Sequence, residues 1–463
     1  MDNRPLLAGA AVLAAALLGA SAAGLVAPAG AERPSLPSSP PSPEPWIEAS
    51  HLPPLLRTAG ETAELRFDVY CGPADEAQVD AGCPAAGSVF VRPGAAGPFR
   101  ELPLVREQSA FPGRLAARIS DELARSPRGF EYYAVLRSEA SGRSLTLPGG
   151  GAAAPHRSLL LADPATVALG RHVFGRVRRP DATPARASWG RGPGQVGLEQ
   201  GRVPTPIGGS SFDVDASGTV YLLDEANRRV LRWRPGAASP DEVPLDVNGT
   251  IADLAVAPDG SLHVLETTAA HGRPPVLRSF APDGAPRGAV ALAERPAALL
   301  RGPEGPVVLQ HPSGQWLAAG RGGRLLPPGE QRRAGSSGRP HGRAGEVVVL
   351  RQANELRLAV VGPVGDLWSS WRVTSDTPLG EVQLAEPLGD RLLVVVRVYT
   401  EEQAEFAVLL LGDRGLAKGF SVAASEWAET APLARFRLAA GALYRLGSTP
   451  DGVVVDRFDL EAR

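Results

Sequence analysis

The C-terminal part of the chain repeats itself with a period of 40 to 52 residues, and this repeat limits the fold more than any other feature. The segments "FDVDASGTVYLLD", from Phe212, and "LAVAPDGSLHVLE", from Leu254, match position by position at an offset of 42 residues. Gly218, at the turn of the first unit, is followed by turn glycines at positions 260, 305, 345, 389 and 441, at intervals of 42, 45, 40, 44 and 52 residues. Units of this length, built from short alternating strands, predict a β-propeller.

Each unit contains enough alternating segments for four strands. Third strands such as "RRVLRWRPG" and "PVLRSFAPDG" end in Pro-Gly or Asp-Gly turns, as hairpin geometry requires. We expect six blades within residues 156–463, with five or seven as open alternatives, because the inner strand of unit four falls on the polar segment "QRRAGSSGRPHGR". The sixth unit stops at its third strand, so we expect "SLLLADPATVALGRHVFG" to supply its outer strand and close the ring.

The N-terminus is typical of an export signal. An apolar run from Leu6 to Val26 follows Arg4, and the small residues before Ala31 form a cleavage signature, so we expect residues 1–31 to be removed after Ala31. An uncleaved membrane anchor is the alternative, because the run is long enough to span a bilayer. In both cases the remainder lies outside the cytoplasm. Residues 32–45, "ERPSLPSSPPSPEP", predict an extended linker.

Residues 46–155 predict a separate antiparallel β-sandwich, because short alternating strands recur about every ten residues. The hairpin around Ser141 and Gly142 resembles the late hairpin of immunoglobulin-like modules, which implies a spacer or docking domain. Cys71 and Cys83 are the two cysteines of the chain. In an exported protein such a pair predicts a disulfide, which would stabilise the fold by roughly 3 kcal/mol.

The composition favours an all-β chain and gives no support for nucleic-acid binding. Glycine (53 residues) and proline (45) indicate many turns, and the formal net charge is only −2. The fold class we expect is therefore all-β, with an N-terminal antiparallel β-sandwich followed by a six-bladed β-propeller.

The first repeat unit, "WGRGPGQVGLEQGRVPTPIGGSSFDVDASGTVYLLDEANRRVLRW", resembles an NHL repeat. The matching residues are Trp189, Gly190, Gly192, Gly194, Gln195, Pro206, Asp213 to Asp215, Gly218, Val220, Tyr221, Asp224, Asn227 and Arg228. Later units keep the period and the turn but lose the Asp-x-x-Asn corner. The resemblance implies a six-bladed propeller of the NHL and TolB-like type. It implies no single activity, because such propellers include binding scaffolds, lactonases, lyases and peptide-processing enzymes.

Motifs that could carry chemistry have simpler structural explanations. Asp224 and Asn227 could bind a cation, but an acid and an amide at a strand corner more often hold the turn itself. The recurring Pro-Asp-Gly triplets predict turns, because each carries a single acid where a calcium loop needs several. The seven histidines do not occupy equivalent inner positions, and no nucleophile motif is present, so we predict no catalytic residue and no metal site.

The channel mouth is the predicted binding site. In propellers the residues entering each innermost strand line one mouth of the central channel, and the repeat alignment places Ser211, Asp253, Arg295, Glu381 and Arg435 there. Such a mixed polar ring suits a polar small molecule, a peptide or a protein loop.

The leading functional hypothesis is an exported, non-catalytic binding or scaffold protein of the cell envelope, with a protein or peptide partner and no cofactor. Membrane contact is expected only if the N-terminal segment stays uncleaved. The alternative is a metal-dependent lactonase or lyase on the same propeller, with calcium or zinc held at the channel mouth.

Overall fold

The computed structural model describes residues 46–72, 82–94, 96–108, 111–199, 206–209, 211–267, 275–292, 295–301, 306–311, 316–321, 324–333, 339–341, 345–363, 365–424, 427–428 and 435–460. The predicted signal, its cleavage position at Ala31 and the predicted linker lie outside these ranges. The described chain is almost entirely β, with one short helix, α1 (Asp121–Ala124), and one 3-10 turn (Gly151–Ala153). No helix within these ranges is long and apolar enough to cross a bilayer.

Two sheets form the N-terminal β-sandwich. The first has the strand order β1 (Trp46–Ser50), β3 (Glu64–Gly72), β7 (Arg114–Arg118) and β6 (Val105–Arg106). The second has the order β2 (Leu56–Thr58), β10 (His156–Leu161), β8 (Phe130–Ser138), β4 (Ala85–Pro93) and β5 (Arg100–Pro103), with β9 (Ser144–Leu147) also paired to β8. The pairing is antiparallel except between β10 and β2.

Alternate residues of the sandwich strands fill its core. On β3, Leu65, Phe67 and Val69 are fully buried, and they pack with buried residues of β4 and β8 from the other sheet. The predicted hairpin is formed by β8 and β9. Strand β10 belongs to this sandwich, so the sandwich continues past the boundary that we expected at residue 155.

Cys71 and Cys83 form the predicted disulfide, with their Cα atoms 5.6 Å apart. The bond joins β3 to the segment that leads into β4.

Six further sheets among the described residues are the blades of a β-propeller. Blades I to III are β13 (Ser211–Val214), β14 (Val220–Asp224), β15 (Arg229–Trp233) and β16 (Asp241–Pro244); β17 (Thr250–Val256), β18 (Leu262–Thr267), β19 (Val276–Phe280) and β20 (Pro286–Ala291); and β21 (Arg295–Arg301), β22 (Pro306–His311), β23 (Trp316–Ala318) and β26 (Arg332–Arg333). Blade III also carries a two-stranded hairpin of β24 (Gly320–Arg321) and β25 (Arg324–Leu325).

Blades IV to VI complete the set. They are β27 (Arg339–His341), β28 (Gly345–Gln352), β29 (Glu355–Val361) and β30 (Leu367–Thr374), with β11 (Ala165–Ala168) outside them; β31 (Leu379–Leu388), β32 (Arg391–Tyr399), β33 (Ala404–Gly412) and β34 (Gly415–Ala423); and β35 (Phe436–Ala439), β36 (Ala442–Thr449) and β37 (Gly452–Asp459), with β12 (Ala182–Ser188) outside them.

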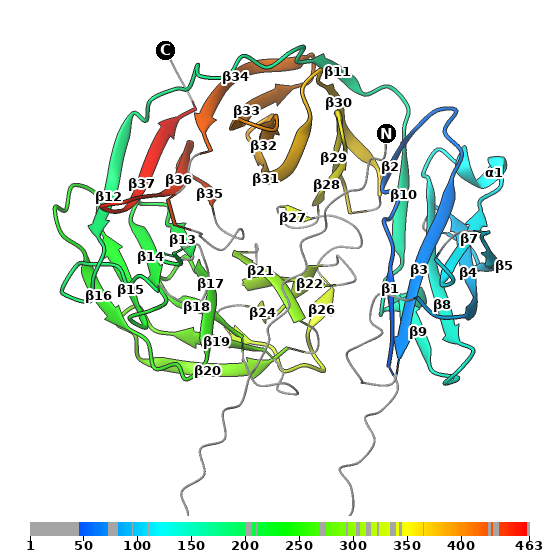
Figure 1. Ribbon diagram of the computed structural model, residues 1–463, viewed down its shortest axis with the longest axis horizontal. Coiled ribbons are helices and arrows are strands. Elements are labelled where there is room, and N and C mark those ends of the chain that lie inside the picture. The colour runs from blue at the N-terminus through cyan, green and yellow to red at the C-terminus, as the bar shows by residue number, and fades with distance from the viewer. Residues whose placement is uncertain are drawn as a thin grey trace, which may run out of the picture. The chain divides into compact units, whose positions relative to one another are not determined.

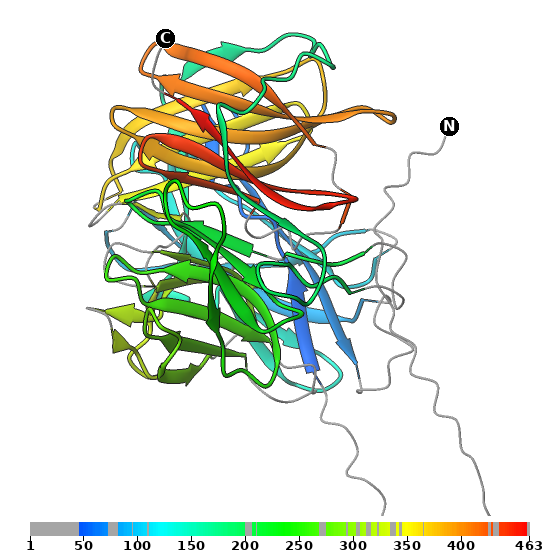
Figure 2. The ribbon, with the colours of Figure 1, turned by 90° about the vertical axis from the view of Figure 1, so that its left-hand side faces the viewer.

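The blades stand around a common centre (Figure 1). Their innermost strands contact one another from blade to blade, β35 with β13, β13 with β17, β17 with β21, and β31 with β35. From the side, the green strands of blades I and II lie below the orange and red strands of blades V and VI (Figure 2). Blades I, II, V and VI bury apolar side chains on both faces, because a neighbouring blade covers each face. Blade IV packs one face against blade V and the other against the sandwich.

The repeated turn explains the sequence period. In blade I the Asp215 carboxylate accepts hydrogen bonds from the backbone N–H groups of Ser217 and Thr219, and Gly218 adopts a φ of +85°. In blade II, Asp259 accepts from the Ser261 N–H, and the intervening Gly260 has a φ of +79°. The Asp-Gly pattern is therefore turn chemistry, as the sequence predicted.

The ring closes as predicted, but with a different strand. The outer strand of blade VI is β12, which pairs antiparallel with β37 and starts beyond the segment "SLLLADPATVALGRHVFG". That segment divides between two other sheets, since β10 joins the sandwich and β11 adds a fifth, parallel strand to blade IV. The inner strand that the sequence barely indicated in blade IV is present as the short β27.

Candidate functional site

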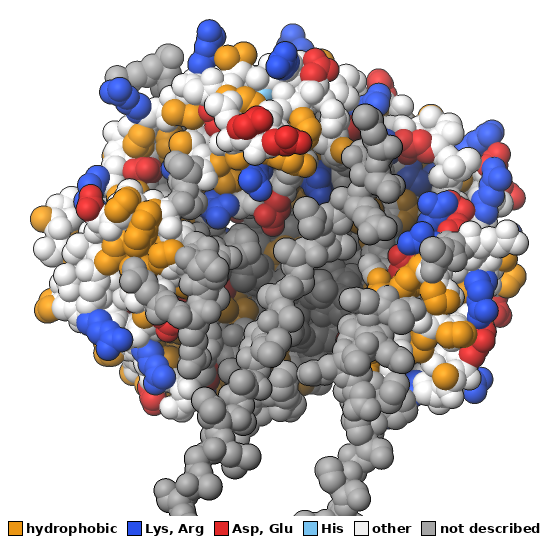
Figure 3. Space-filling view, in the orientation of Figure 1, with side chains coloured by type: hydrophobic (Ala, Val, Ile, Leu, Met, Phe, Trp, Pro, Cys, Tyr) orange, Lys and Arg blue, Asp and Glu red, His pale blue; other side chains and the backbone are white. Residues whose placement is uncertain are grey.

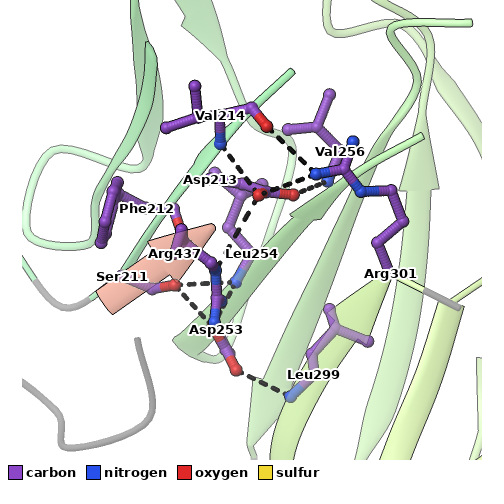
Figure 4. Close-up of polar contacts among 10 residues, drawn as sticks. All are labelled: Ser211, Phe212, Asp213, Val214, Asp253, Leu254, Val256, Leu299, Arg301 and Arg437. Atoms are coloured by element: carbon purple, nitrogen blue, oxygen red, sulfur yellow. Dashed lines mark hydrogen bonds and ion pairs between the residues drawn. The ribbon is translucent and has the colours of Figure 1, made fainter. Parts of the chain in front are cut away.

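Two aspartates and two arginines meet where four innermost strands approach one another. Asp213 lies on β13, Asp253 on β17, Arg301 at the end of β21, and Arg437 on β35 (Figure 4). Both aspartates are almost completely buried. We refer to these four residues as the inner cluster.

Asp213 joins blades I and II. One carboxylate oxygen, Oδ1, accepts from the N–H of Val214 at 2.8 Å, within its own strand. The other, Oδ2, accepts from the N–H of Val256 in blade II, also at 2.8 Å. The carboxylate therefore satisfies an N–H on a strand edge that has no further strand beside it, which would be costly to leave unpaired when buried.

Asp253 repeats this arrangement one blade further on. Its Oδ2 accepts from the N–H of Leu299 in blade III at 2.7 Å, and its Oδ1 accepts from the N–H of Leu254 at 2.8 Å. Ser211 of blade I donates its hydroxyl to the same Oδ1 at 2.5 Å. Three blades are thus linked through one side chain.

The two guanidinium groups complete the charge balance. Arg437 donates from Nε to the Phe212 carbonyl at 3.1 Å, and its Nη2 lies 3.6 Å from Asp253 Oδ1, an ion pair beyond hydrogen-bond distance. Arg301 donates from Nη2 to the Val214 carbonyl at 3.0 Å and lies 3.5 Å from Asp213 Oδ1. Two positive and two negative groups therefore share one small region.

Burial raises the pKa of the Asp253 carboxyl above its ordinary value. The positive charge of Arg437 and the hydrogen bonds from Ser211, Leu299 and Leu254 offset part of this effect, because they stabilise the ionised form. This is the behaviour of a carboxylate enclosed by donors inside the protein.

The inner cluster binds blades together. All four carboxylate oxygens accept hydrogen bonds from groups of the protein itself. No group of three His, Cys, Asp or Glu side chains in the described ranges could hold a metal ion. The exposed part of the cluster is Arg301, whose side chain is 31% accessible.

Of the five predicted mouth residues, the structure brings Ser211 and Asp253 together, in the direct contact described above. Arg295 opens β21, but its side chain lies outside the described set. Glu381 is exposed and accepts from the Gln383 side chain at 2.8 Å, and the Arg435 guanidinium lies 5.4 Å from the centre of the Phe406 ring.

Three members of the inner cluster were missed by the sequence argument. Asp213 and Arg437 occupy equivalent positions in "SFDV" and "RFRL", two residues after the predicted Ser211 and Arg435. The opposite charges of Asp213 and Arg437, at equivalent positions of the neighbouring blades I and VI, could have predicted this contact from the sequence. No sequence pattern pointed to Arg301, because this residue lies at the C-terminal end of β21 and not near its start.

The Asp224 corner proves to be structural, as the sequence argument favoured. Asp224 is fully buried and accepts from the Gly197 N–H, from the Asn227 side-chain amide and from Arg229. The left-handed residue of this turn is Arg228, with a φ of +53°, and not Asn227. The corner holds the glycine-rich segment before blade I against that blade.

On the face shown in Figure 1, blue and red side chains lie close together between the centre of the propeller and its upper rim (Figure 3). Sheets arranged around a centre and joined by the inner cluster define a β-propeller protein that carries an N-terminal β-sandwich.

No family model matches the chain, and no curated protein matches it in sequence. Similar solved structures include hydrazine synthase of Kuenenia stuttgartiensis (12% identity, 53% of this chain and 75% of that chain, TM-score 0.33). YCF48 of Cyanidioschyzon merolae is 13% identical over 57% of this chain and 99% of its own, with a TM-score of 0.31. The β-propeller domain of Cps50 (Swd1) of Myceliophteria thermophila is 9% identical, with the same two coverages and TM-score. Likenesses of this size carry no functional argument, and the propeller assignment rests on the sheets described above.

Proposed function

We propose that the protein is a non-catalytic binding scaffold outside the cytoplasm, built on a six-bladed propeller of the NHL and TolB-like type. The export signal expected in residues 1–31 and the Cys71–Cys83 disulfide both support this location. In this proposal the sandwich is a spacer or docking module of immunoglobulin-like type.

The partner we propose is a protein or peptide that presents an acidic side chain to the propeller centre. The observation that carries this proposal is the state of Arg301. Its Nη2 is engaged with Val214 and Asp213, whereas its Nη1 and Nε make no hydrogen bond to any described residue. A partly exposed guanidinium with free donors is suited to bind a carboxylate, since it presents N–H groups in a fixed fork.

The buried carboxylates favour a scaffold over the lactonase or lyase alternative. Asp213 and Asp253 already accept hydrogen bonds at both oxygens, so using them for acid-base or metal chemistry would first require breaking contacts between blades. Stoichiometric calcium or zinc in the purified protein, together with hydrolysis of a lactone, would support the enzyme instead.

A selection experiment tests the proposal. A random peptide library displayed on phage is selected on the parent protein and on two variants, Arg301→Gln and Arg287→Gln. Arg287 is the matched control, because it is an exposed arginine of blade II that forms a surface ion pair with Asp259. We expect acidic sequences among the peptides selected by the parent and by Arg287→Gln, and their loss with Arg301→Gln. Acidic sequences that persist with Arg301→Gln, or that never appear, contradict the proposal.

A further inference from the structure

Trp368, on β30 of blade IV, is presented to solvent by a β-bulge. The pairing of β29 with β30 runs from Val360 opposite Ser369 directly to Val361 opposite Leu367, so Trp368 is the extra residue of the bulge. Its side chain is 55% exposed, which is unusual for the largest apolar side chain. Bulges commonly redirect a side chain near functional sites.

The indole ring of Trp368 is held in place. Its Nε1 donates to the Asp366 carboxylate at 2.7 Å, so the polar edge of the ring is already satisfied. Gly362 lies directly beside it, since a Cβ atom added there would come within 2.6 Å of Nε1. A ring fixed in this way offers its faces to a ligand at little cost in conformational entropy.

Trp368 borders a pocket of about 410 Å³ between blades IV and V. The pocket is lined by residues of β30, by the chain leading into β11, and by Asp413 from the turn between β33 and β34. Asp163 and Asp413 are exposed and make no hydrogen bond or ion pair within the described part of the chain. No lysine or arginine lines the pocket, so its charge is negative.

The floor of this pocket is an open strand edge. The outermost strand, β11, pairs with β30 only at Trp371–Thr374. Beside Leu367–Ser370, none of the described strands is present on the outer side, although these residues line the pocket. A strand edge of this kind carries backbone N–H and C=O groups that can pair with another extended chain.

We propose that Leu367–Ser370, with Trp368, Asp163 and Asp413, is a docking edge for an extended basic peptide segment of a partner protein. The peptide backbone adds to β30 as a short strand. A lysine or arginine side chain lies over the Trp368 ring and pairs with the two carboxylates, because an aromatic face and a negative charge both attract a cation. This site lies between the outer parts of blades IV and V and shares no residue with the inner cluster. Its test is therefore independent of the test for the proposed acidic partner.

A neutral saccharide stacked on Trp368 is the main competing occupant. It would use the ring face, but it would need neither the open backbone edge nor the unpaired charges of Asp163 and Asp413. The open edge and the negative charge together therefore favour the peptide.

The test uses the full chain and a fluorescent seven-residue peptide that alternates arginine and valine, with binding followed by fluorescence anisotropy. We expect Trp368→Ala to weaken binding at least about tenfold, and the double variant Asp163→Asn/Asp413→Asn to weaken it by a similar factor. Matched controls are Tyr399→Ala, a partly exposed aromatic of blade V, and Asp390→Asn, an exposed aspartate. Both controls should bind as the parent does.

Two altered probes separate the parts of the proposal. A peptide with glutamate in place of arginine, and a peptide N-methylated at alternate residues to block strand pairing, should each bind at least about tenfold more weakly. Equal binding of either probe overturns the proposal, as does unchanged affinity in Trp368→Ala. Trp368-dependent binding of cellotetraose, without binding of the basic peptide, assigns the pocket to a saccharide and also overturns it.

Discussion

His263 differs in chemistry from the residue at the same position of the preceding blade. In blade I that residue is Tyr221, whose hydroxyl donates to the Asp215 carboxylate at 3.1 Å. His263 is 2% exposed, and neither of its ring nitrogens has a hydrogen-bond partner among the residues that the structure describes. Burial therefore lowers its pKa from 6.5 to about 4, with a small opposing effect from Asp259 and a further lowering by Arg287.

This shift predicts a loss of stability in mild acid. The pKa of His263 is lower in the folded state than in the unfolded state, so protonation favours unfolding. The free energy of unfolding is therefore unaffected by this group above pH 6.5 and falls as the pH decreases from 6.5 towards 4. At pH 5 the loss is about 2 kcal/mol. The variant His263→Phe should lose correspondingly less stability than the parent between pH 7 and pH 5, as measured by urea denaturation. Parallel pH curves for the two proteins would show that His263 titrates normally.

At the scale of single residues, the sequence predicted some of the inner cluster and missed the rest for a physical reason. The 42-residue offset correctly related Ser211 to Asp253, because both positions keep the same place in their strands. The sequence could not show which of Arg435 and Arg437 belongs to the cluster. Only the packing of β35 determines that Arg437 lies beside Asp253 and that Arg435 lies over the Phe406 ring.

At the scale of elements, β12 closes the ring by joining residues far apart in the sequence. Ala185 and Ala187 of this strand are buried against blade VI, whereas Arg186 and Ser188 between and beyond them are exposed. The closure therefore depends on one face of a single strand.

The two faces of β12 give a matched pair of variants. Ala187→Asp places a charge in the apolar core beside β37 and should lower the free energy of unfolding by about 3 kcal/mol. Arg186→Asp on the exposed face should change it by no more than about 0.5 kcal/mol. Hydrogen exchange followed by mass spectrometry should show faster exchange in β12 and β37 for Ala187→Asp alone. Equal exchange in both variants would mean that β12 does not secure the ring.

The sequence predicted the blades better than their connections. Turn glycines such as Gly218 and Gly260 mark each unit locally, so the period was readable. The strand that closes blade VI could not be predicted, because β12 is a polar, alanine-containing segment with little β-propensity of its own. Its pairing is determined by the edge that β37 leaves open.

At the scale of the whole molecule, sandwich and propeller share an interface within the compact unit Pro45–Arg463. Leu56 and Leu161 of the sandwich pack with Val348 and Val361 of blade IV. Beside them, the buried Arg357 donates to both carboxylate oxygens of Glu61, at 2.6 and 2.5 Å. The two domains should therefore unfold together.

Removing Arg357 should separate the two domains. Arg357→Met removes the guanidinium that pairs with Glu61 and Glu355, and it should cost about 2 kcal/mol, because charge-assisted hydrogen bonds of a partly buried ion pair are lost. Scanning calorimetry should show a single transition for the parent and two for this variant. Arg372→Met is the control, since Arg372 is more exposed and also pairs with Glu355. If Arg357→Met still melts in one transition at the parent temperature, the interface does not couple the domains.

The central claim is that the carboxylates of Asp213 and Asp253 hold the blades together, and that Arg301 binds the acidic side chain of the partner. The free energy of unfolding of Asp253→Ala, measured by urea denaturation, tests it most directly. We predict a loss of about 3 kcal/mol, because the N–H groups of Leu299 and Leu254 and the guanidinium of Arg437 lose their buried partner. Unchanged stability, together with loss of acidic-peptide binding, would show instead that Asp253 is a ligand-binding group and would contradict this account.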